Sequence, residues 1–318
     1  MIDVSVIIPV YNTEAYIEET IKSVADQEMK NYEIIVVDDG STDKSIEIAE
    51  RVLRDGAIPY RVILQANKSQ ASARNTGIEA ASGAYVCFVD SDDIISPSHI
   101  SAMYSLAEKN DLDIVCCKYE YTTVENRYGS GEQGRGEPGR EKIDHRIISD
   151  EEFTEAIITR KPSIHICCVL LKREFLLTNN LLFNERLRYG EDSEFFLQLA
   201  KVRKSVGLTN NVSYKYMDRP GSTMKTITLE RGEAFIEEIK KTCDRLGSNR
   251  AYGRWVLGFL HAFARCAEYN EFKKIAGKVD RRLVLEALRT NKQLSVKGFA
   301  LLFRIHPALA YIAVKMVG

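Results

Sequence analysis

Tyr85-Val86-Cys87-Phe88-Val89-Asp90-Ser91-Asp92-Asp93 holds the most informative pattern of this chain. Its apolar half predicts a buried strand, because the strands of a parallel sheet are covered on both faces and carry continuous apolar runs. Three carboxylates follow within the next four residues. Open α/β sheets bind ligands at the carboxyl ends of their strands. The stretch therefore predicts a central strand that ends in an acidic ligand site.

The acidic cluster has two interpretations. Its like charges repel one another, and a divalent cation removes that repulsion, since Mg²⁺ and Mn²⁺ take carboxylate and phosphate oxygens as ligands. The first interpretation is therefore a metal site that holds a nucleotide diphosphate. The second is a helix that begins after Asp93 and is capped by these acids. The residues of the cluster leave both open.

Strands and helices alternate before and around this stretch. Apolar runs predict strands at residues 3–10, 33–37, 61–64 and 85–89, and helical periodicity predicts helices at 14–26, 44–55 and 71–81. Such alternation is typical of an α/β fold with a doubly wound, mostly parallel sheet. The first strand is followed neither by Gly-x-Gly-x-x-Gly nor by a Walker loop, which argues against dinucleotide oxidoreductases and P-loop NTPases.

Composition describes a globular protein with an uneven charge distribution. The 318 residues are 45% apolar and 28% charged, with a net charge of −1. Residues 225–318 contain 18 Lys and Arg against 9 Asp and Glu, a net +9, which leaves 26 against 36, a net −10, in residues 1–224. A basic tail on an acidic body indicates a negatively charged partner, such as anionic lipid or nucleic acid, unless solvated helix faces account for it.

The seven cysteines lack the spacing of a zinc site. The adjacent pairs Cys116-Cys117 and Cys167-Cys168 lie in apolar runs, which predicts small buried hydrophobic residues. The N-terminus does not have the pattern of a signal peptide, so we expect a cytoplasmic protein.

Four motifs resemble those of the family 2 glycosyltransferases of GT-A fold, in the same order. They are Val6-Ile7-Ile8-Pro9-Val10-Tyr11-Asn12, Val37-Asp38-Asp39-Gly40-Ser41-Thr42-Asp43, Ala73-Arg74-Asn75-Thr76-Gly77 and Phe88-Val89-Asp90-Ser91-Asp92-Asp93. The resemblance is close over residues 3–100, looser to residue 224 and only general beyond. It implies a glycosyltransferase domain at 1–224, with a nucleotide-sugar half at 1–120 and an acceptor half at 121–224, followed by a basic helical region at 225–318.

The resemblance also implies the donor site and its cofactor. It places Pro9 and Tyr11 against a uracil ring and Asp39 on the ring N3–H, where a charged acceptor makes a strong hydrogen bond. Asp92 is then the ligand of Mg²⁺ or Mn²⁺. The other residues implied to bind the nucleotide are Asn12, Arg74, Asp90, Arg219 and Ser222.

Several of these assignments have plainer alternatives. Asp38 is expected to hold its turn rather than to contact the nucleotide. A surface ion pair would also account for Arg74, and capping of a helix would account for Asp93. The glycine-rich stretch 122–142 is a disordered insertion or a loop that closes over substrate. His165 is interpreted as a structural histidine rather than as a contact to the acceptor.

The stretch Arg188-Tyr189-Gly190-Glu191-Asp192 carries the implied catalysis. In the resemblance, Asp192 removes the proton of the acceptor hydroxyl as general base, and Glu191 orients the acceptor or the base. Helix capping is the alternative for both residues. A single in-line displacement inverts the anomeric centre, so an α-linked donor would give a β-linked product.

Residues 297–317 combine apolar and basic side chains. Arg304, His306, Pro307 and Lys315 interrupt the run, which argues against a transmembrane helix. The pattern is typical of a helix at the membrane interface, although packing against its own chain or a partner chain would also explain it.

We therefore expect a cytoplasmic, metal-dependent, inverting glycosyltransferase associated with the inner face of the membrane. The expected donor is a UDP-sugar, and the expected acceptor is a glycan or a lipid-linked glycan of a bacterial surface polysaccharide. No nucleic acid is expected as a partner, and homo-oligomerisation stays open. A nucleotidyltransferase and a catalytically silent scaffold are the alternatives.

Overall fold

The computed structural model describes residues 2–123, 144–160, 163–218, 227–280, 284 and 294–317. The chain divides into two compact units. The first, called the sheet unit, comprises Met1–Phe153, Ile164–Glu185 and Arg203–Pro220. The second, called the helical unit, comprises Thr154–Ser163, Arg186–Val202 and Gly221–Gly318. The glycine-rich residues 124–142 and the candidate residues Arg219 and Ser222 lie outside the described part of the chain.

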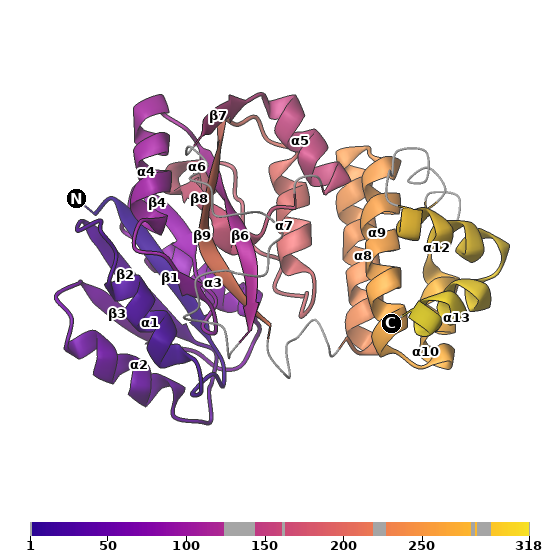
Figure 1. Ribbon diagram of the computed structural model, residues 1–318, viewed down its shortest axis with the longest axis horizontal. Coiled ribbons are helices and arrows are strands. Elements are labelled where there is room, and N and C mark those ends of the chain that lie inside the picture. The colour runs from indigo at the N-terminus through magenta and orange to yellow at the C-terminus, as the bar shows by residue number, and fades with distance from the viewer. Residues whose placement is uncertain are drawn as a thin grey trace. The chain divides into compact units, whose positions relative to one another are not determined.

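The described strands of the sheet unit form one mixed sheet (Figure 1). The strand order is β3-β2-β1-β4-β8-β6-β9-β5, and β7 pairs with β9. The half β3-β2-β1-β4 is parallel, β8 is antiparallel to both β4 and β6, and β6 is parallel to β9. The strands are β1 Val4–Val10, β2 Tyr32–Asp38, β3 Tyr60–Leu64, β4 Tyr85–Phe88, β5 Ile94–Ile95, β6 Ile114–Thr123, β7 His145–Ile148, β8 Val169–Lys172 and β9 Val206–Asp218.

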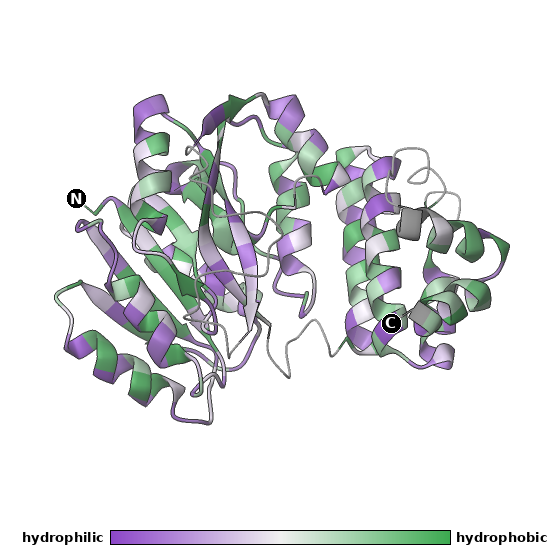
Figure 2. Ribbon diagram, viewed as in Figure 1, coloured by the Kyte–Doolittle hydropathy of each residue, from purple (hydrophilic) through white to green (hydrophobic). Residues whose placement is uncertain are grey.

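Helices connect these strands and confirm the expected α/β fold. They are α1 Ile17–Ala25, α2 Ser45–Arg54, α3 Gln70–Ala80, α4 His99–Asn110, α5 Asp150–Thr159, the 3-10 helix η1 Ile166–Cys168 and α6 Arg173–Thr178. Every residue of β1 and β2 is buried, and Figure 2 shows apolar residues on these central strands. Helix α3 approaches β1 so closely that a Cβ on Gly77 would lie 2.3 Å from Ile7 Cγ2, so this position requires glycine.

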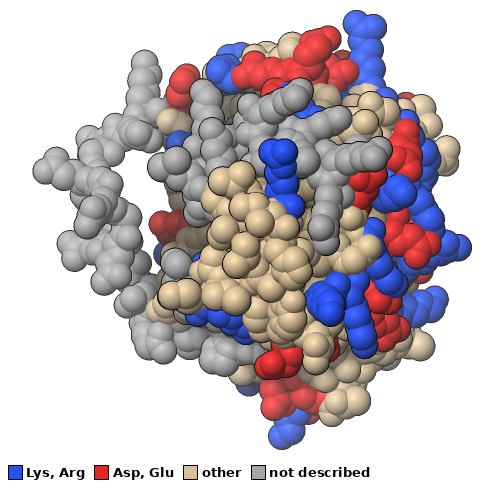
Figure 3. Space-filling view, turned by 90° about the vertical axis from the view of Figure 1, so that its right-hand side faces the viewer, with Lys and Arg blue, Asp and Glu red and all other residues tan. Residues whose placement is uncertain are grey.

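The helical unit has an aromatic core. Its helices include α7 Glu191–Leu199, α8 Leu229–Leu246, α9 Asn249–Cys266, α10 Tyr269–Lys278, α12 Leu294–Ile305 and α13 Pro307–Val317. Phe235 and Phe259 lie 4.8 Å apart between ring centroids, and both are buried. Thr228 and Ser248 cap α8 and α9 through their side chains. Figure 3 shows the side of the molecule that carries α12 and α13, where uncharged surface is bordered by both basic and acidic residues.

The paired cysteines are small buried residues, as expected. Cys116, Cys117, Cys167 and Cys168 are all buried and carry free thiols.

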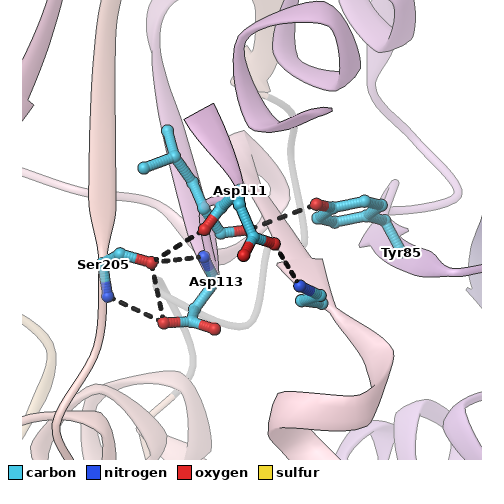
Figure 4. A network of polar contacts seen from close by, with 6 residues as sticks. Tyr85, Asp111, Asp113 and Ser205 are labelled. Carbon is cyan, nitrogen blue, oxygen red and sulfur yellow. Dashed lines mark hydrogen bonds and ion pairs between the residues drawn. The ribbon is translucent and has the colours of Figure 1, made fainter. Parts of the chain in front are cut away.

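A polar clamp fixes the register of β6 and β9 where the two strands begin (Figure 4). Ser205 donates from its backbone N and from Oγ to Asp113 Oδ2, both at 2.8 Å, and Asp113 N donates to Ser205 Oγ at 3.0 Å. Pairing then begins at Ile114 and Val206 and runs to the far ends of both strands. The register shifts between Cys116 and Lys118 and again between Lys118 and Tyr119, so the clamp sets the pairing of the first part of the two strands only.

Candidate functional site

Two adjacent acids at the end of β2 have different surroundings. Asp38 Oδ1 accepts a hydrogen bond from the backbone N of Ser41 at 3.0 Å, so Asp38 holds the turn. Asp39 is 5% exposed, and its Oδ1 accepts from Gln65 Nε2 at 2.8 Å and from Lys68 N at 2.9 Å. Within the described residues, Asp39 Oδ2 has no hydrogen-bond donor. This carboxylate is therefore held rigidly and keeps one oxygen for a ligand.

The residues after β1 lie beside that turn. Pro9 is buried in β1 opposite Val37, whereas Tyr11 is 50% exposed. Asn12 has a left-handed backbone with φ 50°, and its Oδ1 accepts from the backbone N of Thr42 at 2.8 Å. Asn12 therefore ties the end of β1 to the turn after β2, and the exposed ring of Tyr11 lies next to this tie.

Arg74 and Asp90 form a buried ion pair between α3 and the end of β4. Arg74 is 2% exposed, and its Nη2 lies 2.9 Å from Asp90 Oδ1. The guanidinium carbon also lies 5.3 Å from the ring centroid of Phe183. Burial raises the pKa of Asp90, but the charges of Arg74 and His165 outweigh burial and hold that pKa below its usual range. The alternative of a surface ion pair for Arg74 is therefore wrong.

Asp93 has a structural function that differs from the alternative of helix capping. Its Oδ2 accepts from the hydroxyl of Tyr214, and its Oδ1 accepts from the backbone N of Met217 at 2.8 Å. Helix α4 begins only at His99, after β5, and its N-cap Ser98 makes no side-chain capping bond. Capping by the acidic cluster is therefore wrong. Burial and the charges of Asp92 and Asp90 raise the pKa of Asp93 well above its usual range.

Asp92, in the same acidic cluster as Asp90 and Asp93, is the residue expected to bind the cation. Among the described residues, no group of three or more His, Cys, Asp or Glu side chains is placed to hold a metal ion. Mg²⁺ usually keeps several waters and binds through one or two carboxylates together with substrate phosphates. The half-buried Asp92 lies close enough to Asp93 to raise its pKa. A cation that takes its other ligands from a diphosphate fits this arrangement.

Glu191 and Asp192 occupy the first turn of α7 in the helical unit. The N-cap of α7 is Gly190, with φ 75°, so neither acid is the capping residue. Asp192 Oδ1 accepts from the backbone N of Ser193 at 2.6 Å, and Glu191 is 9% exposed. Negative charge at a helix N-terminus is favourable. Glu194, one turn further on, is a structural acid whose Oε1 accepts from Thr242 Oγ1 at 2.7 Å.

The sequence did not reveal several residues that shape these sites. Gln65 and Lys68 position Asp39. Asn75 positions Phe183 through two hydrogen bonds: Asn75 Nδ2 donates to Phe183 O at 2.9 Å, and Phe183 N donates to Asn75 Oδ1 at 2.8 Å. A second group is aromatic: tyrosines recur at alternate positions of β6, at 119 and 121, and of β9, at 214 and 216. The alternation of tyrosines in the sequence could have revealed this group, because residues two apart on a strand point to the same face of the sheet.

His165 lies within this aromatic group and makes a structural hydrogen bond. Its Nδ1 accepts from the backbone N of Cys167 at 3.4 Å, at the start of η1. The bond orients the imidazole ring within this aromatic group.

Comparison with known proteins supplies the context of this geometry. The family model described as glycosyl transferase family 2 matches residues 5–171. The uncharacterized glycosyltransferase EpsJ of Bacillus subtilis is 39% identical over 69% of this chain and 62% of its own length. The glycosyltransferase GlyG of Streptococcus pneumoniae is 33% identical over 70% of this chain and 73% of its own length. The matched region thus spans less than two thirds of EpsJ.

Two solved structures share the fold. Residues 1–349 of S. aureus TarS, in complex with UDP-GlcNAc, match with a TM-score of 0.68 at 21% identity, over 99% of this chain and 91% of that one. The mannosyltransferase PcManGT of Pyrobaculum calidifontis, in complex with GDP-Man and Mn²⁺, matches with a TM-score of 0.56 at 18% identity, over 99% of this chain and 86% of that one. The GT-A fold expected from the sequence motifs is therefore confirmed.

Proposed function

The chain belongs to glycosyl transferase family 2, and from that membership we propose that it moves a sugar from a UDP-sugar to a hydroxyl of a glycan or lipid-linked glycan in bacterial surface-polysaccharide synthesis. The assignment of a UDP-sugar as donor rests on Asp39, a buried carboxylate whose hydrogen bonds within the described residues all go to Oδ1. TarS, with the same fold, binds UDP-GlcNAc. EpsJ and GlyG are described as glycosyltransferases.

In this proposal the donor lies along the carboxyl ends of β1, β2 and β4. Asp39 Oδ2 accepts the N3–H of uracil, and the exposed ring of Tyr11 packs on the base above Pro9. Asn12 holds this loop in place through Thr42. Arg74 supports the diphosphate region by fixing Asp90, its ion-pair partner. Arg219 and Ser222 are proposed to contact the diphosphate.

Asp92 is the proposed ligand of Mg²⁺ or Mn²⁺, with Asp90 beside it. When bound, the cation stabilises the negative charge that develops on the departing diphosphate. A transferase that has lost this ligand should bind UDP no better with metal than without it.

The proposed transfer is a single displacement. The acceptor oxygen forms a bond to the anomeric carbon as the bond from that carbon to the diphosphate oxygen breaks. Asp192 takes the proton of the acceptor hydroxyl, and UDP leaves. Glu191 is proposed to orient the acceptor or Asp192. The attack comes from the side opposite the leaving group, so the anomeric configuration inverts.

Calorimetric titration tests the donor site. UDP, GDP and CDP are titrated with and without Mn²⁺ into wild type, Asp92→Ala and a control, Asp55→Ala, in which an exposed acid of the same unit is removed. We expect UDP to bind more tightly than GDP or CDP. Mn²⁺ should raise the affinity for UDP at least about tenfold in wild type and in Asp55→Ala, and this increase should be absent in Asp92→Ala. Binding of none of the three nucleotides would overturn the proposal.

We further propose that α12 and α13 contact an anionic membrane surface. Five large apolar side chains on these helices are exposed: Leu301 53%, Ile305 63%, Leu309 42%, Ile312 52% and Met316 82%. Residues 294–317 contain Lys297, Arg304 and Lys315 and no acid. None of the helices that the structure describes has the length and apolar character needed to cross a bilayer. Exposed apolar side chains with flanking cations are typical of helices that lie at a lipid interface.

Co-sedimentation with vesicles tests this contact. Wild type, Ile305→Ser/Ile312→Ser and the control Leu177→Ser are mixed with vesicles of phosphatidylcholine alone or with phosphatidylglycerol; Leu177 is 48% exposed in the sheet unit. We expect wild type and the control to bind the anionic vesicles and the double variant to lose most binding. Lipid-independent sedimentation, or a change of oligomeric state in the double variant by light scattering, would assign the surface to a second copy of the chain.

A further inference from the structure

An aromatic cluster lies at the carboxyl ends of β6 and β9, and we define it as Tyr119, Tyr121, His165 and Tyr216. Ring centroids of successive members lie 5.5 Å apart for Tyr119 and Tyr121, 5.4 Å for Tyr121 and Tyr216, and 5.2 Å for His165 and Tyr216. His165 also lies 5.8 Å from Tyr119, which closes the ring of contacts. The register between β6 and β9 places Tyr121 opposite Tyr216.

The cluster is at the protein surface. Tyr121 is 71% exposed, and the other three members are partly exposed. Tyrosine usually buries its ring and keeps its hydroxyl in water, so a side chain of this size standing mostly in solvent is unusual on a strand. Cross-strand aromatic pairs do stabilise sheets modestly, but that benefit does not require four rings in mutual contact at an exposed strand end.

The cluster is coupled to the acidic cluster through Tyr214. His165 lies 6.0 Å from the Tyr214 ring, and Tyr214 donates to Asp93 while its hydroxyl oxygen accepts from Asp90 N at 3.4 Å. All these residues belong to the sheet unit. The aromatic cluster therefore adjoins the carboxylates assigned to the diphosphate and its cation.

The chemistry of this surface suits a sugar ring. A pyranose carries several C–H groups on one face and hydroxyls around its edge. The C–H face packs on an aromatic ring, whose π face is negative, while hydroxyls bond to polar groups at the margin. Tyrosine hydroxyls and the imidazole of His165 supply such polar groups. A purely apolar partner would not need them.

From this geometry we propose that the aromatic cluster binds a pyranose ring of the acceptor glycan, with Tyr121 as the principal stacking residue. The inference rests on the proposed transfer reaction and specifies where its second substrate binds. Within the part of the chain that the structure describes, the assigned nucleotide contacts lie on α3 and at the ends of β1, β2 and β4, and β8 separates β4 from the cluster's strand β6. This separation from the base-binding residues favours a ring of the acceptor, and the experiment below distinguishes it from the sugar of the donor.

Saturation-transfer NMR tests the inference with simple probes. The methyl β-pyranosides of glucose, galactose, N-acetylglucosamine and N-acetylgalactosamine are titrated into wild type, Tyr121→Ala, Tyr121→Phe and Ile147→Ala, each saturated with UDP and Mn²⁺. Ile147 is the control because it is also an exposed strand residue of the sheet unit, at 56%. We expect at least one probe to bind wild type through its C–H face. Tyr121→Ala should weaken that Kd about fivefold or more, as for the loss of one aromatic contact, and Tyr121→Phe and Ile147→Ala should stay within about twofold of wild type.

The outcomes are distinguishable. Binding of no probe, or binding that is equal in wild type and Tyr121→Ala, overturns the inference. Displacement of a probe by the matching UDP-sugar but not by UDP assigns the cluster to the donor's sugar and overturns the acceptor assignment. UDP and Mn²⁺ titrations of the same variants report the donor site separately, so a failure of the acceptor inference is distinct from a failure of the proposed function.

Discussion

Tyr214 on β9 donates its hydroxyl hydrogen to Asp93 Oδ2 at 2.5 Å, and this bond joins the acidic cluster to the far part of the sheet. Met217 N donates to the other oxygen of the same carboxylate. Asp93 is thereby committed to structure, whereas Asp90 and Asp92 are the acids proposed to serve the diphosphate and its cation.

The first prediction follows from this division. Asp93→Ala removes the acceptor of two buried donors, Tyr214 Oη and Met217 N, and should lower the free energy of unfolding by about 2–4 kcal/mol. Asp93→Asn keeps an acceptor for Met217 and a polar partner for Tyr214, so its loss should be about 1 kcal/mol or less. Urea unfolding followed by circular dichroism measures both.

Asp92→Ala is the matched control for that prediction. Its carboxylate is half-buried and assigned to a ligand, so its removal should change stability by less than about 1 kcal/mol. An Asp93→Ala variant as stable as Asp92→Ala would show that the bonds to β9 contribute little.

The second prediction concerns the buried pair of Arg74 and Asp90. Arg74→Met should lower the free energy of unfolding by about 3–5 kcal/mol, because it leaves the largely buried Asp90 carboxylate without its cation. Adding Asp90→Asn removes that stranded charge and should recover part of the loss. The double-mutant cycle, measured by urea unfolding, should therefore give a coupling energy of about 1–3 kcal/mol. Additive losses would contradict a direct interaction.

The third prediction is a pH dependence caused by Glu33. This side chain is 7% exposed; Ser5 Oγ, Ser82 N and Ser82 Oγ donate to its Oε1, and Arg61 donates to its Oε2. Burial raises the pKa of Glu33, but these hydrogen bonds outweigh burial and lower it from 4.5 to about 2. The unfolded chain thus takes up this proton at higher pH than the folded chain.

The stability that Glu33 contributes is therefore complete above pH 4.5 and is lost as the pH falls toward 2. Glu33→Gln should cost about 2–3 kcal/mol near neutral pH. That difference from wild type should shrink in acid. Urea unfolding of both proteins at several pH values measures it, and a difference that stays constant with pH would assign the loss to shape rather than to charge.

Much of the sheet unit could be predicted because its signals are local. An apolar run followed by a polar turn marks each strand from β1 to β4, and helical periodicity marks α1 to α3. The position of β8 could not be predicted in this way. Its run from Val169 to Leu171 looks like any buried strand, and nothing local shows that it lies antiparallel between β4 and β6.

The candidate site could be proposed from its residue types, but the partners of those residues could not be predicted. Asp39 and Asp92 were found from motifs, whereas Asp93 depends on Tyr214, 121 positions further along the chain. Arg74 was expected to bind the nucleotide, with a surface ion pair as the alternative, and its buried partner Asp90 follows 16 positions later. Such pairings depend on the sheet order, which brings β4 and β9 to the same site.

The fourth prediction tests the general base. Asp192→Asn keeps the acceptor for Ser193 N but cannot take a proton, so kcat should fall by about 10²–10⁴-fold. UDP binding should be unchanged, and inversion should persist in the residual product. The control is Glu194→Gln, which alters the structural acid two residues away and should leave kcat within about tenfold, provided that the variant folds. An unchanged kcat in Asp192→Asn would assign the base to another residue.

The last prediction concerns the turn that presents Glu191 and Asp192. Gly190 has φ 75°, and a Cβ there would lie 2.4 Å from two ring atoms of Phe235. Gly247 has a similar φ of 68°, but a Cβ there would meet nothing within 4 Å. Both alanine variants adopt a left-handed backbone at a cost of about 1–2 kcal/mol. Only Gly190→Ala must also displace a buried ring, which adds about 1–3 kcal/mol.

Thermal or urea unfolding should therefore rank Gly190→Ala as clearly less stable than Gly247→Ala. Gly190→Ala/Phe235→Leu separates the two causes, because the smaller side chain relieves the overlap but leaves the backbone strain. Partial recovery in this double variant would show that Phe235 holds the turn in place. Equal stability of the two single variants would show that the ring moves aside at no cost, and α7 would then begin without a fixed support.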